Sequence, residues 1–184
     1  MQVLKTIVIA VLISLLLIGT LFPLSAQILT ARQYQVKAAF LYNFTQFVEW
    51  PARAFPEDGA PIVIGVLGED PFGSYLDELV AGEEMNGHQL IVRRFNQNDE
   101  IMNCHVLFIN KIGKDKTAQI LERIKGQSIL TVSDVPGFLQ RGGIIRFTTV
   151  DNKIKFQINQ EASKSAELTI SSKLLQLAEI VHPE

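Results

Sequence analysis

The sequence predicts an α/β fold in which a largely parallel sheet is flanked by helices, in the three-layer Rossmann or flavodoxin-like manner, with an antiparallel hairpin at one edge. Compact apolar runs at residues 62–67 and 106–109 are typical of strands buried on both faces. Segments with helical spacing alternate with such runs, which indicates parallel strands covered by helices. Residues 145–158 alternate apolar and polar side chains instead, and this pattern predicts the hairpin.

The first expected element is a long helix over residues 32–49. Val36, Phe40 and Phe44 recur there at helical spacing and give it a broad apolar face. Pro51 ends this helix, because proline disfavours the helical conformation in the residue before it.

A second helix is expected after the strand over residues 62–67. Asp70 is placed as its N-cap and Pro71 as its first residue, and Phe72 and Leu76 belong to its apolar face. The next elements are strands over residues 89–95, 106–109 and 129–132 and a helix over residues 115–125.

Two helices are expected after the hairpin. Residues 160–166 predict a short one, and Ser171-Ser172 is the expected cap of the last. The apolar side chains of the last helix, which are expected to point inward, are Leu174, Leu175, Ala178 and Val181.

The amino-terminal segment has the order of an export signal. A short start with Lys5 precedes an apolar run over residues 7–22, and small residues then lead to a plausible cleavage site between Ala26 and Gln27. The apolar run is a little short for a permanent membrane span. We therefore expect residues 1–26 to be a signal peptide and residues 27–184 to form one exported domain, with an uncleaved membrane anchor as the alternative.

Charge and cysteine content limit the kinds of partner and of covalent cross-link that we expect. The chain of 184 residues has 17 basic and 19 acidic residues, a net charge of −2. No basic run occurs along the chain, which argues against nucleic acid or anionic lipid as the partner. Cys104 is the single cysteine, so an internal disulfide is excluded, and its apolar neighbourhood predicts a buried thiol.

The sequence predicts no catalytic group, cofactor or metal site. His88, His105 and His182 are too far apart along the chain for metal-ligand spacing. Cys104 precedes His105 directly, but successive strand residues point to opposite faces, so the two cannot form a nucleophile and base pair. We therefore expect a protein that is not an enzyme.

A small-ligand site is a further hypothesis, because ligands of open α/β sheets gather at the carboxyl ends of the strands. The alternative is that the loops there are ordinary turns. The candidate ligand-binding residues at this edge are Gly68, Asp70, Ser133, Asp134 and Arg141.

Five strings in one order resemble the YfiR/HmsC-like family of exported proteins, and the resemblance covers essentially the whole mature chain. The strings are residues 37–44 with 47–51, residues 64–72, residues 104–109, residues 130–134 with 137–138 and 141–144, and residues 156–159 with 168–178.

The resemblance implies a periplasmic negative regulator. Such a protein binds the periplasmic part of an inner-membrane diguanylate cyclase, or another membrane sensor protein, and restrains cyclic-di-GMP signalling and biofilm formation. It also implies an α/β protein that self-associates, so a homodimer is a further expectation. Redox control through internal disulfides, which the family also implies, is in doubt here because Cys104 is alone. The alternative is a periplasmic small-ligand-binding protein that feeds a sensor kinase or a transport system.

The first helix offers a surface for such a partner, because its large apolar residues exceed one core-facing stripe and aromatic side chains are favoured anchors. The alternative is that this helix is simply buried. The candidate partner-binding residues are Tyr34, Leu41, Tyr42, Phe47 and Trp50.

Overall fold

The computed structural model describes residues 2, 22–96, 101 and 103–182. Its contacts divide the chain into two units, residues 1–34 and residues 35–184, and helix α2 (Phe22–Phe47) continues from the first into the second. The apolar run of the expected export signal lies outside the described residues, apart from Phe22 at its end. No helix in the described part of the chain is long and apolar enough to cross a membrane.

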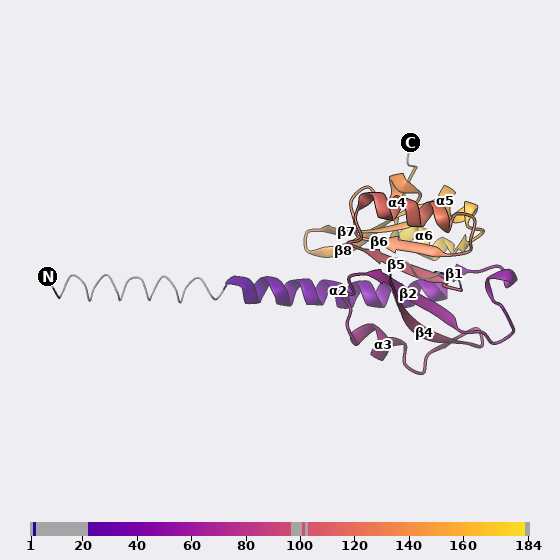
Figure 1. Ribbon diagram of the computed structural model, residues 1–184, viewed down its shortest axis with the longest axis horizontal. Helices are drawn as coiled ribbons and strands as arrows, with labels where there is room; N and C mark the ends of the chain where they lie inside the picture. Colours follow the sequence, from indigo (N-terminus) through magenta and orange to yellow (C-terminus); the bar gives the residue numbers. More distant parts are fainter. Residues whose placement is uncertain (1, 3–21, 97–100, 102, 183–184) are drawn as a thin grey trace. The chain divides into compact units, whose positions relative to one another are not determined.

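The described part of the second unit contains an eight-stranded sheet with the order β10-β8-β7-β6-β5-β2-β4-β3 (Figure 1). Neighbouring strands are parallel except for the pairs β7–β8 and β3–β4. The strands are β2 (Ile62–Gly68), β3 (Glu84–Met85), β4 (His88–Phe95), β5 (Val106–Asn110), β6 (Leu130–Ser133), β7 (Ile145–Val150), β8 (Lys153–Asn159) and β10 (Glu179–Val181).

A mixed α/β fold with a mostly parallel sheet is thus confirmed. The parallel block β4–β2–β5–β6–β7 follows the order 2-1-3-4-5 when its strands are numbered along the chain, which is also the order in flavodoxin-like sheets. The complete Rossmann or flavodoxin-like assignment stays a prediction.

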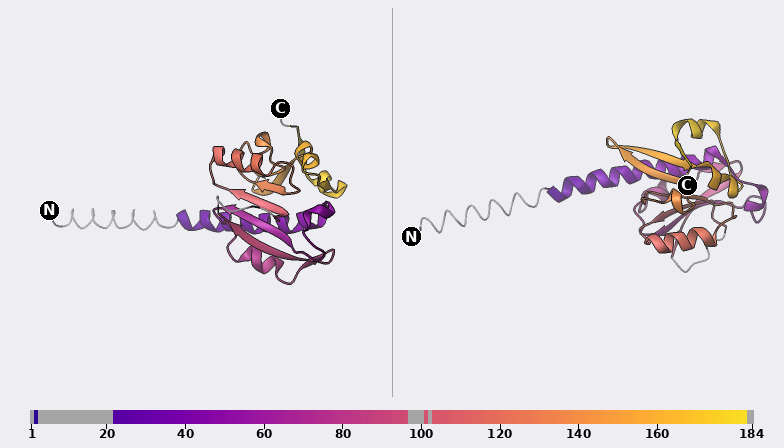
Figure 2. Two further views of the ribbon diagram at one scale, coloured as in Figure 1. Left: turned by 45° about the vertical axis from the view of Figure 1, so that its right-hand side comes forward. Right: turned by 90° about the horizontal axis from the view of Figure 1, so that it is seen from above.

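Helices cover both faces of the sheet (Figure 2). On one face, Phe44 of α2 packs on Phe147 and Phe156, with ring centroids 5.9 and 5.5 Å away. On the other face, α4 (Lys114–Arg123) and the 3-10 helix η2 (Leu139–Arg141) close a second cluster. The large side chains of that cluster include Leu67, Leu107, Ile109, Ile120, Leu121, Phe138 and Leu139.

The sequence predicted that the hairpin would form one edge of the sheet, but a further strand lies beyond it. The last helix, α6 (Ser172–Leu177), is shorter than expected, and β10 pairs in parallel with β8 as a further strand at that edge. Ser171 does cap α6, since its hydroxyl accepts a hydrogen bond from the N–H of Leu174. Ala178 then turns extended, which places Ile180 beside Ile158 instead of on a helix face.

The second helix also begins later than predicted. α3 spans Tyr75–Val80, with Ser74 as its N-cap residue. Asp70 accepts a hydrogen bond from the N–H of Phe72 and so stabilises a turn. Gly73, with a φ of +55°, interrupts the helical path between this turn and α3.

Several short elements complete the fold. β1 (Val48–Glu49) directly follows α2, which ends two residues before the predicted limit, and pairs antiparallel with β9 (Thr169–Ile170). The sequence did not predict this two-stranded sheet, because strands of two residues leave no periodicity. The others are the 3-10 helix η1 (Ala52–Ala54) and α5 (Gln160–Ser165).

Candidate functional site

The loops after β2 and β5 pack tightly against each other at the carboxyl edge of the sheet. A Cβ atom on Gly68 would lie 2.0 Å from the carbonyl oxygen of Asn110, and Gly68 has a φ of +96°. The Asn110 side chain donates from Nδ2 to the carbonyl oxygen of Glu69, 3.0 Å away. These two contacts hold the loops together at the edge where ligand-binding residues were expected.

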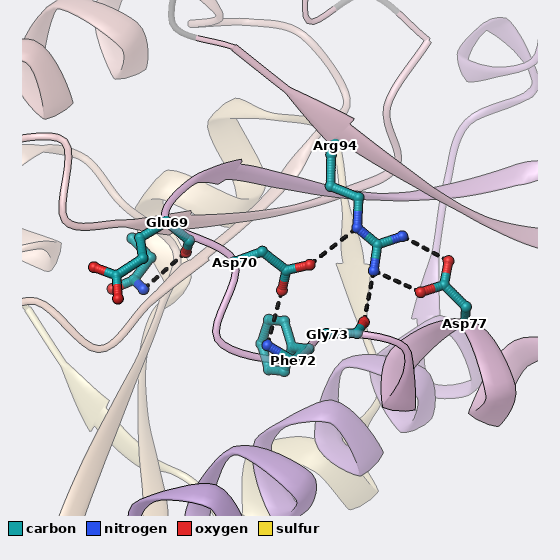
Figure 3. Close-up of polar contacts among 7 residues, drawn as sticks. Glu69, Asp70, Phe72, Gly73, Asp77 and Arg94 are labelled. Carbon is teal, nitrogen blue, oxygen red and sulfur yellow. Dashed lines mark hydrogen bonds and ion pairs between the residues drawn. The ribbon is translucent and has the colours of Figure 1, made fainter.

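Asp70 forms an ion pair with Arg94 of β4, which also binds Asp77 (Figure 3). Its Oδ2 lies 3.0 Å from Arg94 Nε, while Arg94 also donates to both carboxylate oxygens of Asp77 in α3, at 2.6 and 2.5 Å, and to the carbonyl oxygen of Gly73. The hydrogen bonds from Arg94 lower the pKa of Asp77. Asp70 thus joins β4 to the start of α3, and its carboxylate is already occupied.

The other predicted ligand-binding residues are also engaged within the chain. Ser133 donates to the carbonyl oxygen of Ile109 at 2.7 Å and accepts from the N–H of Val135. Asp134 forms an ion pair of 2.5 Å with the buried Lys37 of α2. Arg141 donates to the carbonyl oxygens of Pro136 and Gly137.

One polar atom at this edge has no partner in the described part of the chain. It is Oδ1 of Asn110, a residue that is 1% exposed. Three pockets of about 150, 260 and 280 Å³ occur elsewhere in the second unit, and none of them is lined by the predicted ligand-binding residues. Among the described residues, no group of three His, Cys, Asp or Glu could hold a metal ion.

The predicted partner-binding residues of α2 differ in exposure. Leu41 is fully buried and belongs to the core, so the contact proposed below does not include it. Phe47 is half-buried. Tyr42 and Trp50 are half-buried as well, and the polar atom of each side chain donates a hydrogen bond. Tyr42 Oη donates to Glu83 at 2.7 Å, and Trp50 Nε1 donates to the carbonyl oxygen of His105 at 3.2 Å.

The remaining candidate, Tyr34, lies in the part of α2 that belongs to the first unit. The inward face of α2 in the second unit consists mainly of Ala38, Leu41 and Phe44, all fully buried. Its exposed positions include Gln35, Val36 and Gln46.

Sequence reasoning missed a cluster at the amino ends of β2, β4 and β5. His105 is 1% exposed, and its Nδ1 accepts a hydrogen bond from the N–H of Val63, so Nε2 carries the proton. Nε2 has no hydrogen-bond partner in the described part of the chain. The ring of Phe55 lies 4.6 Å from that of His105 and stacks on His88 at 4.1 Å, and Trp50 packs from another side.

Burial, together with a smaller contribution from the nearby His88, lowers the pKa of His105 to about 4. Burial also raises the pKa of the Cys104 thiol to about 12. Cys104 packs with Leu107 in the cluster under α4, whereas His105 packs against Phe55 and Trp50. These two neighbours in sequence therefore lie in different environments. The apolar run after Cys104 indicated burial, but the fold is needed to see which aromatic rings gather around His105.

The comparison with known families gives one match. The family model described as YfiR/HmsC-like matches residues 34–179, which is most of the chain. No curated protein matches it.

Proposed function

Because this chain belongs to the YfiR/HmsC-like family, we propose that it is a periplasmic negative regulator that binds the periplasmic part of an inner-membrane diguanylate cyclase and restrains cyclic-di-GMP signalling. The observation that carries this proposal is the extent of the family match, which runs over almost the whole of the second unit. The export signal expected in residues 1–26 agrees with a periplasmic site of action.

The mechanism we propose is conformational. A protein that binds the inactive state of the cyclase more tightly than the active state shifts the cyclase toward the inactive state without any reaction of its own. Three observations support this reading. Cys104 is a poor nucleophile because its thiol pKa is about 12, His105 packs in a different cluster, and the carboxylates of Asp70 and Asp134 are engaged in ion pairs.

The contact we propose lies on the half-buried aromatic side chains around the end of α2 in the second unit, namely Tyr42, Phe47 and Trp50. The hydrogen bonds of Tyr42 and Trp50 fix the orientation of both rings before a partner arrives. Side chains that are already ordered lose little conformational entropy on binding, which favours them as anchors.

The test is capture of the cyclase from solubilised membranes by the full chain with a carboxyl-terminal tag, followed by an assay of cyclase activity. Trp50→Ala and Tyr42→Ala are expected to weaken capture by about 30-fold, as for a central aromatic anchor. Tyr75→Ala is the matched control, since Tyr75 is a 36% exposed aromatic on α3. Urea unfolding of every variant separates a lost contact from a lost fold.

Absence of the cyclase from the captured material would contradict the proposed function itself. Unchanged repression in the aromatic variants, together with loss of repression in a folded Asp70→Asn or Asp134→Asn variant, would move the site to the carboxyl edge of the sheet. The alternative, a small-ligand-binding protein that feeds a sensor kinase or a transport system, would then be the better account. The unpartnered Oδ1 of Asn110 is the observation that favours this alternative.

A further inference from the structure

The hairpin of β7 and β8 has one covered and one open face. Phe147 and Phe156 lie on the covered face and are 2% and 3% exposed, because α2 packs on them. Side chains of a strand alternate between the two faces, so the residues next to Phe147 and Phe156, and every second residue from there, lie on the opposite face. These side chains, which we call the open face, are half-buried or exposed: Arg146, Thr148, Val150, Lys153, Lys155 and Gln157.

The open face is basic although the chain as a whole is acidic. Arg146, Lys153 and Lys155 are its charged residues, and none of them forms an ion pair with another described residue. Lys153 and Lys155 are two residues apart on β8, and Arg146 is the diagonal neighbour of Lys155 because it pairs with Gln157. Strand geometry therefore places the Cα atom of Lys155 about 7 Å from those of Lys153 and of Arg146.

Arg146 is held in place but has no carboxylate partner in the described part of the chain. Its Nη1 donates to Oε1 of Gln157 at 3.3 Å, and the amide of Gln157 donates in turn to Glu179 at 2.9 Å. Its Nε is buried, and no hydrogen-bond partner for it lies among the residues that the structure describes. A half-buried guanidinium that meets only a neutral amide gains little for the fold, whereas a carboxylate from outside would match its planar shape.

The same strand has a free edge. β10 pairs with β8 only along Gln157–Asn159, so within the described part of the chain no strand lies on the outer side of residues 153–156. β6 pairs with β7 only at Ile145 and Arg146, and the hairpin projects beyond it (Figures 1 and 2). Unpaired backbone groups at such an edge can hydrogen-bond an added extended segment.

Lysine on an edge strand has a second explanation, because its charge keeps the strands of other molecules from pairing with the edge. That explanation accounts for Lys153 and Lys155 but not for Arg146, which lies further in and is oriented by Gln157. A positive edge repels basic strands, and it disfavours neutral strands because pairing would remove the lysine charges from water. It attracts a strand that carries carboxylates at the matching spacing.

We propose that the free edge of β8 and the open face beside it bind an extended acidic segment of a protein partner, with two carboxylates, two residues apart, facing Lys153 and Lys155 and with Arg146 adding positive charge nearby. This contact is additional to the aromatic contact proposed above. It depends on the proposed function only for the expectation that the cyclase supplies the segment.

The first experiment uses the full chain and a short synthetic peptide in which glutamate and threonine alternate. Binding is followed by fluorescence anisotropy of the labelled peptide, and hydrogen exchange reports the amides of residues 153–156. We expect binding that weakens by about tenfold between about 50 and 300 mM salt, together with protection of those amides. A binding peptide that leaves the amides unprotected would overturn the strand pairing.

The matched variants change the same net charge at different places. Lys153→Glu with Lys155→Glu is expected to weaken peptide binding about tenfold or more. Lys114→Glu with Lys164→Glu, two exposed lysines on α4 and α5, should weaken it by no more than about twofold through long-range repulsion. Equal weakening by both pairs would overturn the proposal. Equally strong, hairpin-dependent binding to vesicles of anionic phospholipid would do the same and assign the surface to a membrane.

Capture of the cyclase separates this proposal from the proposed function. If the hairpin variant captures the cyclase as well as the unchanged chain does, the function stands and a hairpin contact with the cyclase is refuted. If no cyclase is captured but the peptide binds at the hairpin, the hairpin contact stands and the cyclase is not the source of the segment.

Discussion

The central strands and the hairpin are built by different rules, although they belong to one sheet. Every residue of β5 and β6 is buried, because helices cover both faces there. In the hairpin the buried apolar side chains lie on the face under α2, whereas the side chains of the open face are half-buried or exposed and so are in contact with water. A side chain of the central strands is thus constrained by folding, whereas one on the open face is free to serve binding.

Polar groups show the same difference. In the centre, Ser133 and the Nδ1 atom of His105 form hydrogen bonds within the chain, as a buried polar atom must if it is not to cost free energy. On the hairpin, Lys153 and Lys155 have no such partner among the described residues and lose nothing by it, since both are exposed and water solvates them. Mutations should therefore reduce the free energy of unfolding in the centre and affinity at the open face.

The largest expected effect on the free energy of unfolding comes from Phe44, which packs on the buried face of the hairpin. Phe44 is fully buried among Phe40, Phe147 and Phe156. Phe44→Ala should lower the free energy of unfolding by about 3–5 kcal/mol, because it removes the packing and leaves a cavity. Thr148→Ala on the open face is the control and should change it by less than about 0.5 kcal/mol. Urea unfolding measures both, and similar losses would contradict the distinction between the two faces.

A smaller effect is expected from acid, and it belongs to the centre alone. The pKa of His105 is about 4 in the folded chain, against an ordinary value of 6.5. The unfolded chain therefore binds the proton first as the pH falls. The contribution of His105 is complete above about pH 6.5 and is lost progressively down to about pH 4, a loss of about 3 kcal/mol.

Urea unfolding of the unchanged chain and of His105→Gln at about pH 7.5 and pH 4 measures this contribution as the difference between the two pH dependences. The unchanged chain should lose more stability than the variant on acidification. His182→Gln, which changes an exposed histidine near the end of the described chain, should leave the pH dependence as it is. Equal pH dependence in the unchanged chain and His105→Gln would show that His105 is not buried as a neutral ring.

Sequence patterns located most of the central strands because burial on both faces leaves continuous apolar runs such as residues 62–67. They located the hairpin too, but not β10 beyond it, since Glu179–Val181 is a strand of three residues that continued the helical spacing of α6. The sequence analysis did not detect the basic open face, for a different reason. Its cations alternate with apolar residues, so a search for a basic run along the chain does not find them.

The candidate sites were less predictable than the fold. Gly68 and Asp70 do lie at the carboxyl edge, as the strand order implied, yet whether a loop is open depends on its neighbours. The packing of Gly68 on Asn110 and the reach of Arg94 to Asp70 are contacts between segments far apart in sequence. The cluster around His105 likewise needs Phe55 and Trp50 to be brought to the end of β5, which no local pattern encodes.

The smallest of the three effects on stability is expected at Cys104, a buried residue just before the central strand β5, where the substitution to serine replaces only the sulfur atom. Its Sγ lies 3.1 Å from the carbonyl oxygen of Val106, and a Cβ atom on Gly65 would come within 2.6 Å of it. Cys104→Ser should lower the free energy of unfolding by about 1–3 kcal/mol, because a more polar and smaller group replaces a buried thiol. The nearby carbonyl oxygen can accept a hydrogen bond from the new hydroxyl, which favours the lower end of that range. Capture of the cyclase should be unchanged once the variant is folded. A folded Cys104→Ser chain that no longer represses would instead show that this thiol acts between molecules, and a central side chain would then serve binding after all.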